Sequence, residues 1–155
     1  MAIIAPGVSA ARGPSQRSTR RPGPPVADSR VIGESGRVDR QRWDERYSGI
    51  EFDRSTQPNQ FVAAELAGLP PGRALDLAAG GGRNSVWLAE QGWSVTAVDF
   101  SRVGLDKARK LSAARGVGDS QVDWVVADLT DYEPARGAFD LVLVAYLQVG
   151  APLRA

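Results

Sequence analysis

Three aspartates and a run of glycines are the residues of this 155-residue chain whose types and spacing could do chemistry. Glycines occupy positions 80–82, shortly after Asp76, and two further acids follow at Asp99 and Asp128. Glycine lets the backbone approach a ligand closely and adopt positive φ values. A helix expected to begin near Asn84 would direct its free N–H groups to the same place. The pattern indicates a ligand site built from backbone amides and carboxylates.

The elements that must position these residues alternate along the chain. Short apolar runs predict strands over residues 73–79, 93–99, 122–128 and 139–147. Helical spacing of apolar residues predicts helices over 38–47, 58–69, 84–92 and 101–116, with Asn59 and Ser101 as caps. Strands that alternate with helices imply right-handed βαβ units and a parallel sheet. The predicted fold class is therefore α/β, with a doubly wound parallel sheet.

The three aspartates fall at the ends of three successive predicted strands. Asp76 lies late in the first strand, Asp99 ends the second, and Asp128 ends the third. Ligands of such sheets bind outside the carboxyl ends of the strands, where an acid after the second strand can accept the hydroxyls of a ribose. Asp128 could accept a hydrogen bond from an adenine amine. Asp76, under the glycine loop, would favour a cation.

Two cofactors compete for such a site. A dinucleotide motif, G-x-G-x-x-G, would place a diphosphate at the helix N-terminus, but Ser85 stands where its third glycine would be. Asp76 would also be unfavourable beside a diphosphate. A nucleoside that carries an amino acid and a positive sulfur suits an acidic pocket, and this describes S-adenosylmethionine. A nicotinamide-dependent oxidoreductase stays an alternative.

The stretches LDLAAGGGRN, VTAVDFS, VVADLTD and FDLVLVAYL resemble the class I S-adenosylmethionine-dependent methyltransferases, which have a Rossmann-like fold. The preceding WDERY looks like the small-molecule branch near the tellurite-resistance and thiopurine methyltransferases. The resemblance implies that Asp99 binds the ribose and Asp128 the adenine amine, with Phe100 and Leu129 on either side of the adenine ring. The backbone of Ala78, where the family has its first glycine, and that of Gly80 would face the methionine part.

The resemblance implies an enzyme that transfers a methyl group to a small-molecule oxygen, nitrogen, sulfur or metalloid acceptor. The predicted cofactor-binding residues are Asp76, Ala78, Ala79, Gly80, Gly82, Asn84, Asp99, Phe100, Ser101, Asp128, Leu129 and Val144. In-line transfer from a sulfonium needs positioning more than acid catalysis, so the absence of His and Cys is no obstacle. No catalytic residue and no metal site is predicted. A non-catalytic cofactor-binding or assembly module is the other alternative.

Composition divides the chain into two parts. Residues 1–37 hold half of the ten prolines and six Arg against two acids, without any regular periodicity, and predict a disordered basic tail. We favour a passive tail over a nucleic-acid arm, a membrane arm or a transit peptide. Residues 38–155, the predicted methyltransferase domain, carry 13 basic and 16 acidic groups, which disfavours nucleic acid. No apolar run approaches a membrane span, and we expect a cytoplasmic protein.

The predicted sheet is incomplete after its fourth strand. The sequence stops about eight residues after that strand, whereas doubly wound domains usually carry two or three more. We expect either a truncated chain or a partner that completes the sheet, with self-association through the free edge of residues 139–147. Trp43 and Tyr47, one turn apart, either pack the entry helix or cover the cofactor, and Tyr146 either faces the sulfonium or lies at the edge.

Overall fold

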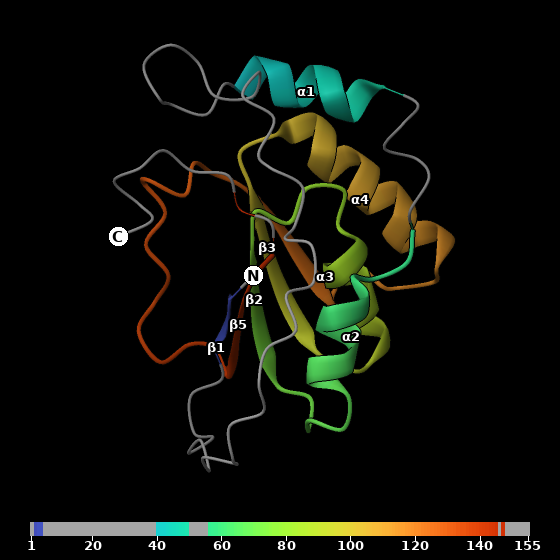
Figure 1. Ribbon diagram of the computed structural model, residues 1–155, viewed down its shortest axis with the longest axis vertical. Helices are drawn as coiled ribbons and strands as arrows, with labels where there is room; N and C mark the ends of the chain where they lie inside the picture. Colours follow the sequence, from blue (N-terminus) through green and yellow to red (C-terminus); the bar gives the residue numbers. More distant parts are fainter. Residues whose placement is uncertain (1, 5–39, 50–55, 146, 148–155) are drawn as a thin grey trace, which may run out of the picture.

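The computed structural model describes residues 2–4, 40–49, 56–145 and 147, and shows a five-stranded sheet (Figure 1). Its strands are β1 (Ala2–Ile4), β2 (Arg73–Leu77), β3 (Ser94–Asp99), β4 (Val122–Val126) and β5 (Leu141–Val144), in the spatial order β1-β5-β2-β3-β4. Strands β5, β2, β3 and β4 are parallel, whereas β1 is antiparallel to β5. The predicted parallel sheet is confirmed, with each of its four strands shorter than the sequence suggested.

In the described part of the chain, four helices accompany the sheet: α1 (Arg40–Ser48), α2 (Gln60–Leu66), α3 (Arg83–Glu90) and α4 (Arg102–Ala114). Both predicted caps are confirmed. The Asn59 side chain accepts hydrogen bonds from the amides of Phe61 and Val62, and the Ser101 hydroxyl accepts one from Gly104. These side chains satisfy amide groups that the first turn of a helix leaves without partners.

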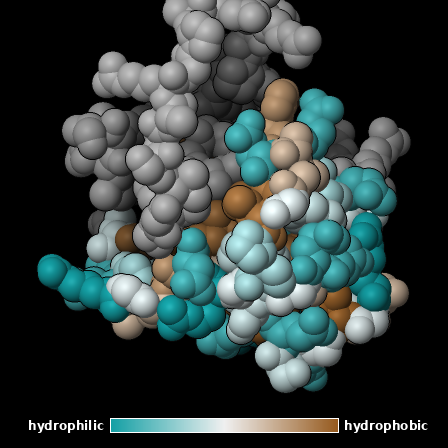
Figure 2. Space-filling model, turned by 90° about the horizontal axis from the view of Figure 1, so that it is seen from below, coloured by the Kyte–Doolittle hydropathy of each residue, from teal (hydrophilic) through white to brown (hydrophobic). Residues whose placement is uncertain are grey.

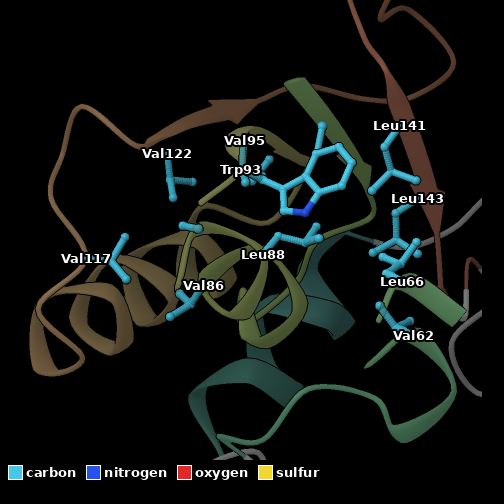
Figure 3. Packing of buried hydrophobic residues seen from close by; sticks show 13 residues of the cluster. Val62, Leu66, Val86, Leu88, Trp93, Val95, Val117, Val122, Leu141 and Leu143 are labelled. Atoms are coloured by element: carbon cyan, nitrogen blue, oxygen red, sulfur yellow. The ribbon is translucent and has the colours of Figure 1, made fainter. Parts of the chain in front are cut away.

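Helices α2, α3 and α4 form a layer against one side of the sheet (Figure 1). In Figure 1, α2, α3 and α4 lie on this side, and the connection of residues 127–140 from β4 to β5 runs along the other. Figure 3 shows the core between the layers, where side chains of α2 and α3 meet those of β3 and β5. The core includes Val62, Leu66, Val86, Leu88, Trp93, Val95, Leu141 and Leu143. Among the described residues, no helix covers the second face that a doubly wound sheet would use.

Strand β5 shows the consequence of this one-sided layer. Leu141 and Leu143 point into the core and are fully buried, while Val142 and Val144 on the opposite face are only partly buried. An almost continuously apolar run such as residues 139–147 is typical of a strand covered on both faces, whereas only one face of β5 is fully buried here. Fully buried and partly buried residues therefore alternate along β5, and the continuous apolar run did not indicate this difference between the two faces.

The edge of β5 that was expected to be free is paired with β1. Ala2, Ile3 and Ile4 lie opposite Val144, Leu143 and Val142 in antiparallel register. Pairing satisfies the amide and carbonyl groups that an open edge would expose, so self-association through this edge is not what the structure shows. The predicted tail of residues 1–37 thus contributes a strand at positions 2–4, and its remaining residues lie outside the described part.

The end of the molecule opposite α1 carries the amino ends of the parallel strands. Figure 2 shows this end, and most of its coloured surface is hydrophilic. Here Asp140 accepts hydrogen bonds from the backbone amide of Arg73, at 2.8 Å, and from its guanidinium, at 3.4 Å. These exposed contacts join the start of β2 to the residue that precedes β5. The candidate site lies at the opposite end of the sheet, at the carboxyl ends of the strands.

Candidate functional site

The loop between β2 and α3 has an unusual backbone. Ala78, Gly80 and Gly82 all have positive φ values, of 60°, 56° and 74°. Ala78 is the only described non-glycine residue in this conformation, and it stands where the predicted motif has a glycine. At Gly82, an added Cβ would overlap Ala108 and lie 2.9 Å from Trp124. The glycine at position 82 therefore allows the loop to press against α4 and β4.

Asp99 connects this loop to the start of α4. Its carboxylate is 3% exposed and accepts two backbone hydrogen bonds of 2.8 Å, from the amides of Gly80 and Ser101. Burial raises the pKa of Asp99, the two backbone hydrogen bonds lower it, and the charge of Asp44 raises it. Each carboxylate oxygen has a second lone pair, so Asp99 can still accept hydrogen bonds from a ligand. The structure thus brings three predicted residues, Gly80, Asp99 and Ser101, into direct contact.

Asp76 lies beneath the loop. It is 1% exposed and accepts a hydrogen bond of 2.6 Å from the hydroxyl of Ser85 in α3. Burial raises the pKa of Asp76 to about 7, Ser85 lowers it, and the charge of Asp99 raises it further. Asp76 therefore holds the first turn of α3 to β2, and its contact with a ligand cation stays a prediction. Ser85, which stands in place of the third glycine of the dinucleotide motif, is thus the hydrogen-bond donor to Asp76.

Asp128 and Leu129 lie just beyond β4 and are partly buried. One carboxylate oxygen of Asp128 accepts hydrogen bonds from the amide and the hydroxyl of Thr130, at 3.0 and 2.9 Å. The amide of Ala127 donates to the carbonyl of Asp99 at 3.0 Å, which places this segment next to the end of β3. Asp128 therefore shapes its own loop, and the adenine contacts of Asp128 and Leu129 stay predictions.

Three other predicted residues have structural contacts. The side-chain oxygen of Asn84 accepts a hydrogen bond of 2.9 Å from the amide of Asn59, so this atom joins α3 to the cap of α2. The amide of Ala79 donates to the carbonyl of Val98 at 3.1 Å. Val144 ends β5, paired with Leu77. Asn84 therefore has a structural contact that its place in the motif did not indicate. Tyr146 lies outside the described residues.

Helix α1 covers the loop with Tyr47, which the sequence analysis named, and with Arg40 and Asp44, which it did not. The Arg40 guanidinium lies 5.9 Å from the centre of the Phe100 ring, and Asp44 accepts a hydrogen bond from the Ser101 hydroxyl. Tyr47 is 6% exposed, and its ring and hydroxyl occupy the space that side chains at Gly104 and Gly80 would need. Positions 40, 44 and 47 share one face of a helix, and this spacing was the available sequence signal.

Tyr47 lies in a buried environment with charged neighbours of both signs. Burial raises the pKa of its hydroxyl, the charge of Asp99 raises it further, and Arg46 and Arg83 lower it. Trp43 stacks on Tyr47 with ring centres 5.6 Å apart and an interplanar angle of 30°. Tyr47 therefore packs α1 against the loop, and Trp43 stacks on Tyr47, in keeping with the packing interpretation. The other interpretation, a cover over the cofactor, stays a prediction.

Comparison with known proteins identifies the family. The family described as "Methyltransferase domain" matches residues 74–153, which include the loop, Asp99 and Asp128. The chain belongs to this methyltransferase-domain family. The resemblance to class I S-adenosylmethionine-dependent methyltransferases is confirmed at this level, whereas the resemblance to the tellurite-resistance and thiopurine branch stays a prediction.

Two curated methyltransferases and one solved structure are similar to this chain. The chain is 42% identical over 74 residues to a demethylmenaquinone methyltransferase of Clavibacter sepedonicus, covering 48% of this chain and 29% of that protein. It is 31% identical over 125 residues to a glycine N-methyltransferase of Oryctolagus cuniculus, covering 76% and 41%. A solved structure from work on the conversion of a disulfide bond into a thioacetal group during echinomycin biosynthesis has 30% identity and a TM-score of 0.57, covering 69% of this chain and 46% of that one. The chain thus spans less than half the length of these relatives.

Proposed function

We propose that this chain binds S-adenosylmethionine at the carboxyl ends of β2 and β3 and supports methyl transfer to a small-molecule acceptor. The observation that carries the proposal is the contact of Asp99 with the Gly80 amide. It joins an acid at the end of β3 to the glycine loop after β2, within a member of the methyltransferase-domain family. Ligands of open parallel sheets bind at this edge.

The residues of the chain would bind and orient the cofactor. Asp99 would accept the ribose hydroxyls with its remaining lone pairs. Phe100 and Leu129, both partly buried, would flank the adenine ring. The loop backbone at Ala78 and Gly80 would lie along the methionine part. When bound, the cofactor supplies an electrophilic methyl group, and the contribution of the chain is to hold it in line with the acceptor.

The site fits a nicotinamide dinucleotide less well. Asp76 is buried directly under the loop, and burial already raises its pKa to about 7, so a diphosphate beside it would disfavour its charged form still further. A diphosphate at the start of α3 would lie close to Asp76, and Ser85 directs its hydroxyl proton toward this acid rather than toward a ligand. A ligand without phosphate avoids that conflict, which supports S-adenosylmethionine over the dinucleotide.

The acceptor is proposed only as a class. The relatives are named for different acceptors, a demethylmenaquinone and the nitrogen of glycine. Among the described residues no helix is long and apolar enough to cross a membrane. We place the acceptor among small molecules, in keeping with the short WDERY helix, α1, at the rim of the site.

Isothermal titration calorimetry tests this proposal with two ligands in parallel. S-adenosylhomocysteine, the stable product form, is expected to bind, while NADH at the same concentrations is expected to give no binding heat. Binding of NADH without any response to S-adenosylhomocysteine would overturn the proposal and favour the oxidoreductase. Heat from neither ligand at millimolar concentration would also overturn it.

A further inference from the structure

Ser101 joins three elements at the edge of the proposed site. This residue is fully buried, and its amide donates to Asp99 at 2.8 Å. Its hydroxyl accepts a hydrogen bond of 3.0 Å from the amide of Gly104 and donates its proton to Asp44 of α1. A hydroxyl has one proton to donate, so Asp44 fixes the direction of that proton and leaves a lone pair for the cap of α4.

The path from α1 to the glycine loop consists of consecutive hydrogen bonds. Asp44 accepts from Ser101, the Ser101 amide donates to one oxygen of Asp99, and the other oxygen of Asp99 accepts from Gly80 at 2.8 Å. Asp44 is 57 residues from Ser101 in the sequence. Through this contact, helix α1 acts on Asp99, the acid that the proposed function assigns to the ribose.

Two neighbouring contacts orient α1 at this place. Arg40 lies one turn before Asp44, over Phe100, and Tyr47 follows about one turn later, between Gly80 and Gly104. Asp44 thus stands between an aromatic contact on one side and a buried ring on the other. Because these contacts fix α1, less backbone freedom is lost when Asp44 binds the Ser101 hydroxyl, and Asp44 can in turn restrict that hydroxyl.

We infer that Asp44 is a positioning residue for the cofactor site, which sets the orientation of Ser101 and, through it, of Asp99 and the start of α4. The inference rests on the proposed function, because its effect is on cofactor affinity. It adds a residue outside the matched stretch of residues 74–153. Asp44 acts through Ser101 and need not touch the ligand.

Calorimetry with S-adenosylhomocysteine tests this role on one control and on four variants, of which the two at Asp44 alone come first and the two that replace Ser101 follow below. Asp44→Ala should weaken binding about fivefold to tenfold, the effect of losing a charge-assisted hydrogen bond that is partly replaced by water. Asp44→Asn keeps an acceptor oxygen and should restore affinity to within about threefold of the wild type. Glu45→Ala is the matched control, because Glu45 is the adjacent acid of α1 and is exposed, and its carboxylate accepts a hydrogen bond of 3.4 Å from Gln41 of the same helix.

A double-mutant cycle separates positioning from general damage. Ser101→Ala and the double variant Asp44→Ala/Ser101→Ala should each bind about as weakly as Asp44→Ala, because the two side chains form one unit and their effects do not add. Urea unfolding of every variant checks that it folds. If Asp44→Ala does not fold, the comparison of Asp44→Asn and Ser101→Ala with the wild type decides.

The outcomes separate this inference from the proposed function. Wild-type protein that binds no S-adenosylhomocysteine overturns the proposed function and, with it, the assignment of Asp44. Wild-type binding combined with equal affinities of Asp44→Ala and Glu45→Ala overturns the inference alone. Additive losses in the cycle, or no rescue by Asp44→Asn, would show that Asp44 acts on the ligand or on stability by another route.

Discussion

Replacement of Ala78 by glycine should stabilise this protein, although glycine normally weakens a fold. Ala78 has a φ of 60°, a left-handed conformation that no other described non-glycine residue adopts. The crowding of Cβ against the following carbonyl oxygen makes this conformation unfavourable by about 1–2 kcal/mol for an ordinary residue. Ala78→Gly removes that strain.

Two smaller terms reduce the gain. Glycine has more conformational freedom in the unfolded chain, which costs about 0.4–1 kcal/mol. Ala78 is partly buried, so loss of its methyl group removes a fraction of the roughly 0.8 kcal/mol that a fully buried carbon group contributes. The net expectation is an increase of about 0.5 kcal/mol in the free energy of unfolding.

Ala79→Gly is the matched control, because Ala79 is the next residue and does not have a positive φ. Both variants change the unfolded chain in the same way, so the difference between them isolates the strain at Ala78. Urea unfolding should show Ala78→Gly more stable than Ala79→Gly by about 1 kcal/mol or more. Equal destabilisation by the two substitutions would refute the reasoning.

Two further predictions concern the residues around the loop. Gly82→Ala places a Cβ against Trp124 at a φ of 74° and should lower the free energy of unfolding by about 2–4 kcal/mol in urea. Gly81→Ala, with open space and no positive φ, should change it by less than about 1 kcal/mol, and similar losses for both would contradict the packing argument. The pKa of Asp76 is raised to about 7 in the folded state, so between about pH 4 and 7 the folded chain holds a proton that the unfolded chain has released. The stability that Asp76 contributes is therefore fully present below about pH 4 and is lost as the pH rises to about 7. Asp76→Asn should accordingly gain stability relative to wild type from pH 5 to pH 8 in urea unfolding. A difference in stability that is independent of pH would contradict the buried acid.

The sequence predicted the elements well because their signals are local. Apolar runs located β2 to β5, and side chains that satisfy the first amides of a helix identified Asn59 and Ser101 as caps. The positions of Asp99 and Gly80 followed from the rule that parallel strands end at one edge of the sheet. Each of these inferences needs only a window of a few residues and a known chain topology.

Long-range contacts account for what the sequence did not reveal. The pairing of residues 2–4 with β5 joins segments about 140 positions apart, and nothing within the short apolar start of the chain specifies its partner. The orientation of Asp76 toward Ser85 depends on the face of β2 that meets α3. The spacing of positions 40, 44 and 47 indicates a shared helix face, but it does not identify the partner of Asp44, the Ser101 hydroxyl 57 residues away.

The strain at Ala78 was also hidden. The substitution of alanine for the expected glycine was visible in the sequence, but the left-handed backbone at that position is a property of the folded loop. The structure shows that position 78 keeps the left-handed conformation typical of glycine although an alanine stands there. Local sequence rules predict which residue a conformation prefers, and tertiary contacts decide whether a less suitable residue must adopt it.

The central claim, that Asp99 accepts the ribose of an S-adenosyl cofactor, is tested most directly by changing protein and ligand together. Calorimetry would compare S-adenosylhomocysteine with its 2′-deoxy analogue on wild-type protein and on Asp99→Ala, with Asp128→Ala as the control. The account predicts that wild type and Asp128→Ala lose about tenfold in affinity on removal of the hydroxyl, while Asp99→Ala, already weaker by about tenfold or more, loses little further. An equal loss in wild type and Asp99→Ala would show that another residue holds the ribose and would contradict the account.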